Sequence, residues 1–594
     1  MKALYNMSNV DASSLAARPR TRDRFDIVAA ALIVVVYVGA FLILPHRGFW
    51  INDNGCKFIQ LQGLIENDYH RFTIPWPGQA VDASFEYNPL PSPFGHVVDG
   101  ELYGAFSPVF PLSSSFPFRV FGPTGLYLLP VVAGLLTLPA VWLLVGRLSL
   151  ASEGRAVARS LATLIVALGT PMWFYSLTFW EHTPAACLVA WAVLCYVRYH
   201  ETGAIRSLAV SALLAGLAVY FRDELYLFGA VLLGVTLIRG RDRVRGVVAF
   251  ASIFVLVLGP LWWFQWSAIG HPLGHHFRIG SVFDIGLSAH LATRLRVANL
   301  LLVNVDPATW LSIMLAAPYL AFLLVNPTFR NRSFARVIPV CASIACLTGA
   351  IVLARHLTAD RPIRWLLHAN GLFAASPFLL LAFVGVRRPL QGSGNGPRER
   401  ASFRPARVVW MIILLHTVLY VALAPEGRSH GIHWGCRYLL PVYPLIGALT
   451  AVTVSRWWTA PKLGSGIARV TVVLALALSI SMQVYSLTLL NRRKAFSAEL
   501  NRAVAERPEE VIVASGWYVP QELAFSFFDK QIFLIETQEA ADRLIGTLKR
   551  NGTREVLFAV SPPTRDAGSG SSIVVGDGSL KFISVELQPV RLTE

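Results

Sequence analysis

Charged residues are scarce in this sequence. Asp, Glu, Lys and Arg make up 15% of its 594 residues and hydrophobic residues make up 54%, whereas ordinary soluble domains hold about 25% charged residues. Only six cysteines are present, and the sequence contains neither a Cys-x-x-Cys pair nor a His-Glu-x-x-His pattern. The composition therefore excludes an ordinary soluble enzyme, offers no zinc motif, and predicts a polytopic membrane protein.

Apolar runs of membrane-spanning length recur along the chain. A helix needs about 20 apolar residues to cross the hydrocarbon layer. The first run, 27–45, is too long for a signal peptide and is followed by no small-x-small cleavage site, so we expect it to remain as a span. The runs predict thirteen transmembrane helices, near 27–45, 125–146, 160–178, 183–197, 207–221, 225–238, 246–267, 308–325, 337–354, 366–385, 408–424, 438–455 and 470–490.

Positive charge is unevenly distributed. The chain carries 52 Lys and Arg against 35 Asp and Glu, a net charge of +17. Because cytoplasmic loops retain Lys and Arg, the excess predicts a multi-pass membrane protein with a cytoplasmic basic N-terminal segment, and it needs no nucleic-acid partner. We expect the membrane to be the inner (plasma) membrane of a bacterium. The excess lies in the segments that alternating spans place on the N-terminal side: 1–26, 147–159, 198–206, 239–245, 326–336, 386–407 and 456–469.

The C-terminal part, 491–594, changes character. Stretches 510–515, 531–536, 555–560 and 581–587 are typical of strands, and 538–550 is typical of a helix. We expect a small α/β domain on the outer, periplasmic face, because an odd number of spans puts the termini on opposite sides. It lacks a Gly-rich phosphate loop, so its expected role is a structural or partner-docking cap.

The expected fold is thus an all-α polytopic membrane domain, 27–490, followed by this α/β domain. The membrane domain includes an outer loop, 46–124, with interfacial helices. Within that loop, apolar residues at Phe58, Leu61 and Ile65 recur at helical spacing. They predict a helix lying along the membrane interface, with Asp53 at its start. Asp53 is a candidate catalytic base; the alternative is that Asn52 or Asp53 only caps this helix.

Ionisable residues collect in four outward stretches. Taken singly, each has a structural interpretation, such as a solvated loop or a polar end beside an aromatic belt containing Trp173, Tyr175 and Trp180. Together they predict one site for an anionic, membrane-embedded substrate, because the arginine fork donates two hydrogen bonds to a phosphate. The stretches contain Asp53, Lys57, Asp99 and Glu101; Glu181 and His182; Arg222, Asp223 and Glu224; and Arg428, His433, Arg437 and Tyr438.

Two residue pairs leave alternatives open. Cys56 and Cys436 are the only cysteines on the predicted outer side, where disulfides are permitted. They can pair if their two loops build one site, and are otherwise independent small residues. His430 and His433 are compatible with a metal ion, although no metal-binding pattern supports one.

The order of these motifs resembles the GT-C superfamily, the bacterial lipid-linked-sugar glycosyltransferases related to protein O-mannosyltransferases and the lipid A aminoarabinose transferase. The resemblance covers roughly 25–490 and rests on order rather than on any single motif. The matching features are an acid-bearing loop after the first span, Phe106-Ser-Pro-Val-Phe-Pro111, Ser176-Leu-Thr-Phe-Trp-Glu-His182, Gly216-Leu-Ala-Val-Tyr-Phe-Arg-Asp-Glu224 and Gly435-Cys-Arg-Tyr-Leu-Leu-Pro441.

The resemblance implies a mechanism. A polyprenyl-phosphate sugar enters from the bilayer, and Asp53 removes a proton from a hydroxyl of a glycan, lipid or protein acceptor, which attacks the anomeric carbon with inversion. Arg222, Arg428 or Arg437 stabilises the leaving phosphate. Glu101, Asp99 and Glu181, in that order, are the alternative bases. The family often has an Asp-Glu pair where this chain has Asp53-Asn54, so a divalent metal is only an option.

Other functions fit the same composition. A transporter or flippase of lipid-linked sugars would place charges in mid-span along a path, whereas the predicted spans are nearly free of charge. An O-antigen ligase or polymerase shares the lipid-linked substrate but typically has its large loop late in the chain. An assembly factor would depend on the C-terminal domain. Transfer from a polyprenyl-phosphate sugar in vitro separates the first function from the others.

Topology gives the first testable prediction. Reporter fusions at Arg241 and at Ser569 should report opposite sides of the membrane, because the positive-inside rule places the basic loop 239–245 in the cytoplasm. A phosphatase reporter should be active only at Ser569, and a fluorescent protein only at Arg241. Matching sides would contradict the odd number of spans and the shared outer face.

Overall fold

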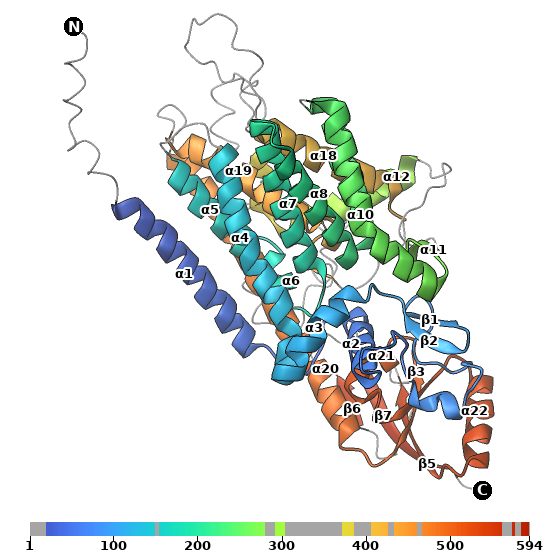
Figure 1. Ribbon diagram of the computed structural model, residues 1–594. Helices are drawn as coiled ribbons and strands as arrows, with labels where there is room; N and C mark the ends of the chain where they lie inside the picture. The colour runs from blue at the N-terminus through green and yellow to red at the C-terminus, as the bar shows by residue number, and fades with distance from the viewer. Residues whose placement is uncertain are drawn as a thin grey trace, which may run out of the picture.

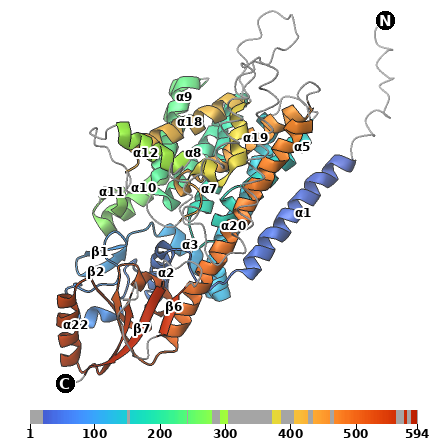
Figure 2. The same cartoon turned by 180° about the vertical axis from the view of Figure 1, so that it is seen from behind.

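The architecture is a long helical bundle with a mixed sheet beyond one end (Figure 1). The structure is a computed structural model, and it describes residues 20–148, 154–240, 242–278, 291–302, 371–384, 405–425, 433–459, 466–560, 573–576 and 584–592. The C-terminus lies at the sheet end, opposite the start of the first helix (Figures 1 and 2).

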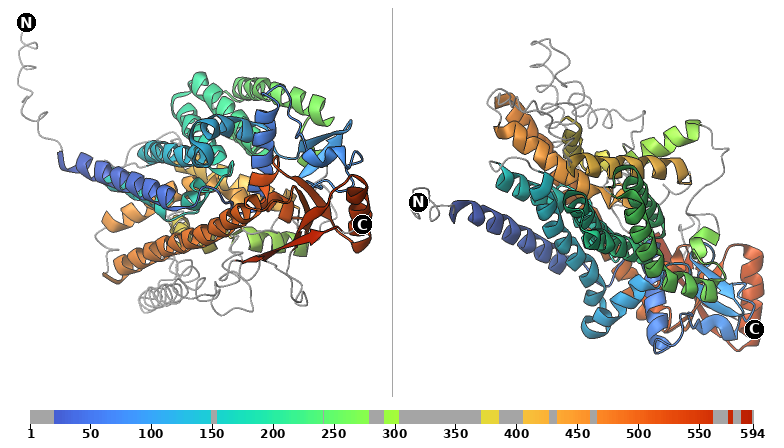
Figure 3. Two further views of the ribbon diagram at one scale, coloured as in Figure 1. Left: turned by 90° about the horizontal axis from the view of Figure 1, so that it is seen from below. Right: turned by 45° about the horizontal axis from the view of Figure 1, so that its top comes forward.

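The bundle contains the apolar helices. They are α1 (Arg20–Ile43), α4 (Leu128–Leu148), α5 (Arg155–Leu168), α7 (His182–Thr202), α8 (Ile205–Phe221), α9 (Tyr226–Arg239), α10 (Arg243–Ile269), α18 (Pro405–Leu423), α19 (Val442–Thr459) and α20 (Gly466–Ala505), with the shorter α6 (Met172–Ser176), α11 (His275–Arg278), α12 (Leu291–Leu302), α16 (Leu372–Ala375) and α17 (Leu381–Val384). α1 lies at the edge of the bundle (Figure 3), where Ile27, Val35 and Ile43 are exposed. Such a helix suits contact with lipid.

The predicted count of thirteen spans is not confirmed. Five helical stretches of the described chain are long and apolar enough to cross a membrane: Asp26–Ile43, Val109–Leu148, Arg243–Ile269, Pro405–Leu423 and Val472–Ala505. α5 and α9 have only 14 residues each, and α7 and α8 pack on each other and on other helices inside the bundle. The predicted spans 308–325 and 337–354 lie outside the described residues, and of 366–385 the structure describes 371–384.

The first outer loop is mostly regular structure. It contains α2 (Asn52–Glu66), an antiparallel hairpin of β1 (Gly95–Val98) and β2 (Glu101–Gly104), and α3 (Val109–Phe121), which continues through a 3₁₀ turn (Gly122–Tyr127) into α4. A helix at Phe58, Leu61 and Ile65 is confirmed, but its predicted place along an interface is not. Phe58 and Leu61 are fully buried, because α2 packs against α3 and the C-terminal residues.

The C-terminal residues form what we call the C-terminal module, 511–592. Its strands are β3 (Val511–Ser515), β4 (Gln531–Ile535), β5 (Glu555–Val560), β6 (Ile573–Gly576) and β7 (Ser584–Arg591), in the order β4-β3-β5-β7-β6. β3 pairs in parallel with β4 and β5, whereas β7 is antiparallel to β5 and β6. The predicted strands and the helix α22 (Gln538–Arg550) are confirmed; the four-residue β6 was not predicted.

Patterning explains the module. β3 is an unbroken apolar run, buried from Val511 to Ala514, as expected for a central parallel strand. α22 is amphipathic: Ala541, Leu544 and Leu548 face the sheet, and Thr537 caps its first turn by accepting a hydrogen bond from the Ala540 N–H.

The module and the first outer loop share one hydrophobic core. Phe58 and Trp76 from the loop lie in the same buried cluster as Val513, Phe533 and Leu544 from the module. α20, 40 residues long, runs from the bundle to the sheet (Figure 2). The loop that carries Asp53 therefore packs against the C-terminal module.

Candidate active site

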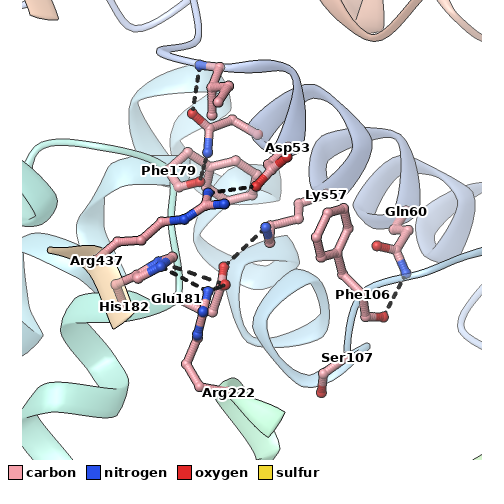
Figure 4. Close-up of polar contacts among 12 residues, drawn as sticks. Asp53, Lys57, Gln60, Phe106, Ser107, Phe179, Glu181, His182, Arg222 and Arg437 are labelled. Carbon is pink, nitrogen blue, oxygen red and sulfur yellow. Dashed lines mark hydrogen bonds and ion pairs between the residues drawn. The ribbon is translucent and has the colours of Figure 1, made fainter. Parts of the chain in front are cut away.

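Four segments meet where the bundle joins the C-terminal module (Figure 4). They are the first turns of α2, the turn between α6 and α7, the turn after α8, and the 3₁₀ turn Arg437–Leu439. These segments form what we call the charge cluster: Asp53, Lys57, Glu181, Arg222, Glu224 and Arg437. The convergence predicted from the four outward stretches is found for these residues.

Asp53 is paired with Arg437. The Arg437 Nη1 donates to Asp53 Oδ2 at 3.2 Å, and both side chains are largely buried. Arg437 also donates to the Tyr438 hydroxyl at 2.7 Å and lies 5.3 Å from the ring centre of Trp180. Burial disfavours the cation, but Tyr438 and Asp53 outweigh it and raise the pKa of Arg437 above its ordinary value. Arg437 therefore stays charged in a site largely closed to water.

The alternative role of Asn52 or Asp53 as a helix cap is wrong. The N-cap residue of α2 is Ile51, whose N–H donates to the Asn54 side chain. Asn54 in turn donates to the Phe179 carbonyl at 2.9 Å. The amide therefore links α2 to the turn that carries Glu181, which explains a neutral residue after Asp53.

Glu181 forms ion pairs with both Lys57 and Arg222. Lys57 Nζ lies 3.3 Å from one carboxylate oxygen, and Arg222 donates to the other at 2.8 Å. Arg222 also bonds Glu224 and lies 2.8 Å from the His182 ring nitrogen. Lys57 and Glu181 are 2% and 5% exposed. Burial opposes the charge of Arg222, but Glu224 and Glu181 raise its pKa above the ordinary value.

Several buried hydrogen-bond donors in or near these pairs have no hydrogen-bond partner among the described residues. They include the indole Nε1 of Trp180, the hydroxyl of Tyr175, Nε of Arg437 and Nζ of Lys57. The rings of Tyr175 and Trp180 lie 5.5 Å apart, and both are fully buried. Their assignment to an interfacial belt is therefore wrong, and sequence reasoning missed them as site residues. Unmet donors beside Arg437 suit an anionic ligand.

Some of the remaining candidate residues lie near the charge cluster and others lie on the surface. Asp223 pairs with His276 at 3.2 Å, and the buried His433 ring packs edge-on to Tyr438. Asp99 lies in the tight turn of the β1–β2 hairpin, and Glu101 pairs with Arg71 on the surface. Neither joins the charge cluster. Arg428 and His430 lie outside the described residues.

Of the two alternatives for Cys56 and Cys436, the structure shows independent small residues and no disulfide. Cys56 and Cys436 are both free and buried, and burial raises the pKa of the Cys56 thiol. Each packs as a small apolar residue. In the described part of the chain, no group of three or more His, Cys, Asp or Glu residues could hold a metal ion.

Comparison with known proteins gives a fold. No family profile matches the sequence, and no curated protein matches it either. The apo crystal structure of ArnT from Cupriavidus metallidurans matches with a TM-score of 0.51 and 14% identity, over 95% of this chain and 97% of that one. This chain has the fold of ArnT.

Two further structures match. ArnT bound to undecaprenyl phosphate gives a TM-score of 0.50 at 14% identity over 95% of this chain and 98% of that one. The oligosaccharyltransferase AglB from Archaeoglobus fulgidus, in complex with an inhibitory peptide and a dolichol-phosphate, matches with a TM-score of 0.49 and 10% identity. The match covers 91% of this chain and 70% of that one. The fold shared with ArnT agrees with the resemblance seen in the sequence.

Glu181 should matter for stability as well as for the site. Glu181→Gln leaves the buried Lys57 and Arg222 short of one negative charge, which we expect to lower the free energy of unfolding by about 3–5 kcal/mol. The control is Glu101→Gln, whose exposed pair with Arg71 is worth at most about 1 kcal/mol. Denaturation midpoints in detergent measure both. Equal midpoints for the two variants would contradict the central position of Glu181.

Proposed function

We propose that this protein is an inverting glycosyltransferase that moves a sugar from a polyprenyl-phosphate donor to an acceptor hydroxyl at the outer face of the membrane. The observation that carries the proposal is the buried Asp53–Arg437 pair at the junction of an apolar bundle and a polar module. The fold of ArnT supports it, since one ArnT structure contains undecaprenyl phosphate. The donor's lipid chain would lie among the apolar helices and its phosphate at the cluster.

The charge cluster suits exchange of one anion for another. Its cations, Lys57, Arg222 and Arg437, are matched by carboxylates in the ion pairs described above. An incoming phosphate must therefore compete for a cation. Lys57 Nζ also lacks a hydrogen bond, but the Phe106 ring covers it. Arg437 is better placed, because it has an unmet Nε–H and adjoins the unmet Trp180 indole. We infer that the donor phosphate forms an ion pair with Arg437 in place of Asp53, which leaves the Asp53 carboxylate unpaired.

The freed carboxylate then acts as the base. Asp53 removes the proton of the acceptor hydroxyl, whose oxygen forms a bond to the anomeric carbon. The bond between that carbon and the phosphate oxygen breaks, and the polyprenyl phosphate leaves with the electron pair. Arg437 and Lys57 stabilise the charge that develops on it. A single base suffices for one direct displacement, and the configuration at the anomeric carbon inverts.

Placement supports Asp53 and Glu181 over the other alternative bases. Glu181 lies in the charge cluster, whereas Asp99 and Glu101 lie on a surface hairpin. Glu181 is therefore the second candidate after Asp53, although its two ion pairs favour a role in holding Lys57 and Arg222. We propose that the cytoplasm holds the basic N-terminal segment and the periplasm holds the C-terminal module. Sugar and acceptor remain classes: a hexose or pentose, and a glycan, lipid or protein hydroxyl.

Asp53→Asn tests the base. The amide keeps the shape and a hydrogen bond to Arg437 but cannot take a proton, so transfer from a polyprenyl-phosphate sugar should fall by about 10²–10⁴-fold while donor binding is kept. Asp68→Asn is the control: Asp68 lies beyond α2 with a φ of 48°, a conformation that asparagine tolerates. Transfer by Asp53→Asn at the control rate would move the base to Glu181.

Arg437→Lys tests the phosphate contact. Lysine keeps the charge but loses the planar fork, so the affinity for the donor should fall by about 10–100-fold, as expected when a charge-assisted hydrogen bond is lost. Arg71→Lys, in an exposed ion pair, is the matched control. Titration of the donor in a transfer assay measures both. An unchanged donor KM and kcat would mean that Arg437 only neutralises the buried Asp53 carboxylate and does not contact the donor phosphate.

A further inference from the structure

The C-terminal module holds the first outer loop along the edge of its sheet. The Leu534 N–H in β4 donates to the Tyr87 carbonyl at 2.9 Å, and the Trp76 indole donates to the Ile532 carbonyl at 3.0 Å. β4 is the edge strand of the sheet, so the loop satisfies groups that a free edge leaves unpaired. The loop and the module therefore form one folded body.

Helix α2 rests directly on the module at one glycine. A Cβ at Gly55 would lie 1.9 Å from the backbone oxygen of Gln521, in α21 (Val519–Glu522). Gly55 falls between Asp53 and Lys57, in the same turn of α2. One turn further, Phe58 packs on Phe525 with ring centres 4.4 Å apart. The backbone of α21 therefore sets how deeply the first turn of α2 sits.

The short helix α21 is in turn fixed to α20. Glu522 pairs with Arg493 of α20, and both side chains are at most 2% exposed. Asn501, two turns further along α20, donates to the Glu522 carbonyl at 2.7 Å and accepts from the Phe525 N–H. A buried ion pair needs both partners, because a lone charge in that place is strongly unfavourable. Glu522 thus links the membrane bundle to the support of α2.

We propose that Glu522 is a positioning residue: through the contact of Gln521 with Gly55, it holds the first turn of α2, and with it Asp53 and Lys57, against Arg437 and Glu181. The C-terminal module then serves the reaction without touching substrate. The catalytic consequence rests on the function proposed above. The mechanical part, that α21 fixes α2, stands on the contacts alone.

Two buried cysteines report the mechanical part without any activity assay. Cys56 follows Gly55 in α2, and Cys436 lies beside Arg437 on the opposite wall of the site; each is 1% exposed. If α2 alone shifts, a maleimide should label Cys56 and leave Cys436 protected. General loosening of the protein would expose both. Mass spectrometry of the labelled full-length protein in detergent reads the two sites separately.

The variants are Gly55→Ala and Glu522→Gln, with Gly546→Ala as control, since a Cβ at Gly546 in α22 meets only the tip of Arg550 at 3.9 Å. We expect Cys56 to be labelled at least about 10-fold faster in both variants and at the wild-type rate in the control. Glu522→Asp should restore part of the protection. Should Gly55→Ala fail to fold, the two Glu522 variants decide.

Turnover tests the catalytic part. Glu522→Gln should lower kcat about 10-fold or more in the wild-type background, yet change the residual turnover of Asp53→Asn little, because the two variants then damage the same step. Additive losses would overturn the positioning role. Cys56 protected in both variants, or Cys56 and Cys436 labelled together, would also overturn it. An inactive wild type would refute the proposed function, while the labelling result would still decide the mechanical part.

Discussion

A buried charge must meet an opposite charge, and this requirement organises the site. Asp53 and Arg437 are 384 residues apart in sequence and form an ion pair. Neither can be buried alone without a large loss of free energy. The pair therefore requires that the loop after α1 and the turn before α19 meet, which requires the bundle to close around them. Lys57, Glu181 and Arg222 repeat the same constraint one turn deeper.

Closely approaching backbones make this closure possible. A Cβ at Gly48 would lie 1.8 Å from the Lys494 carbonyl oxygen, and a Cβ at Gly55 would lie 1.9 Å from the Gln521 carbonyl oxygen. Gly48, between α1 and α2, thus lies against the backbone of α20, and Gly55, within α2, lies against the backbone of α21. Aromatic rings fill the remaining space: Phe49 stacks on Phe525, and the Phe106 ring covers the Lys57 ammonium at 3.6 Å. The Lys57 ammonium is thereby shielded from water.

Much of this could be read from the sequence, for identifiable reasons. The module's strands carry unbroken or alternating apolar patterns, and Asp53, Glu181, Arg222 and Arg437 stand at the ends of apolar runs that must share one face. The ion pairs could not be predicted from the sequence, because which acid contacts which cation depends on packing between segments that are far apart in the chain. Trp180 was misassigned because an aromatic residue at a span end has the same local pattern whether lipid or protein covers it. The count of thirteen spans is not confirmed, because two of the predicted spans lie outside the described residues and helices such as α5 have only 14 residues.

The unbroken length of α20 has a consequence for how any acceptor is admitted. Forty residues of helix extend about 60 Å, twice the thickness of the hydrocarbon layer. Beyond Gly466 the helix contains neither glycine nor proline, the residues at which helices usually bend. It therefore has no built-in hinge between the bundle and the C-terminal module. Under the proposed function, an acceptor would have to reach the charge cluster without the module swinging away on a bend in α20.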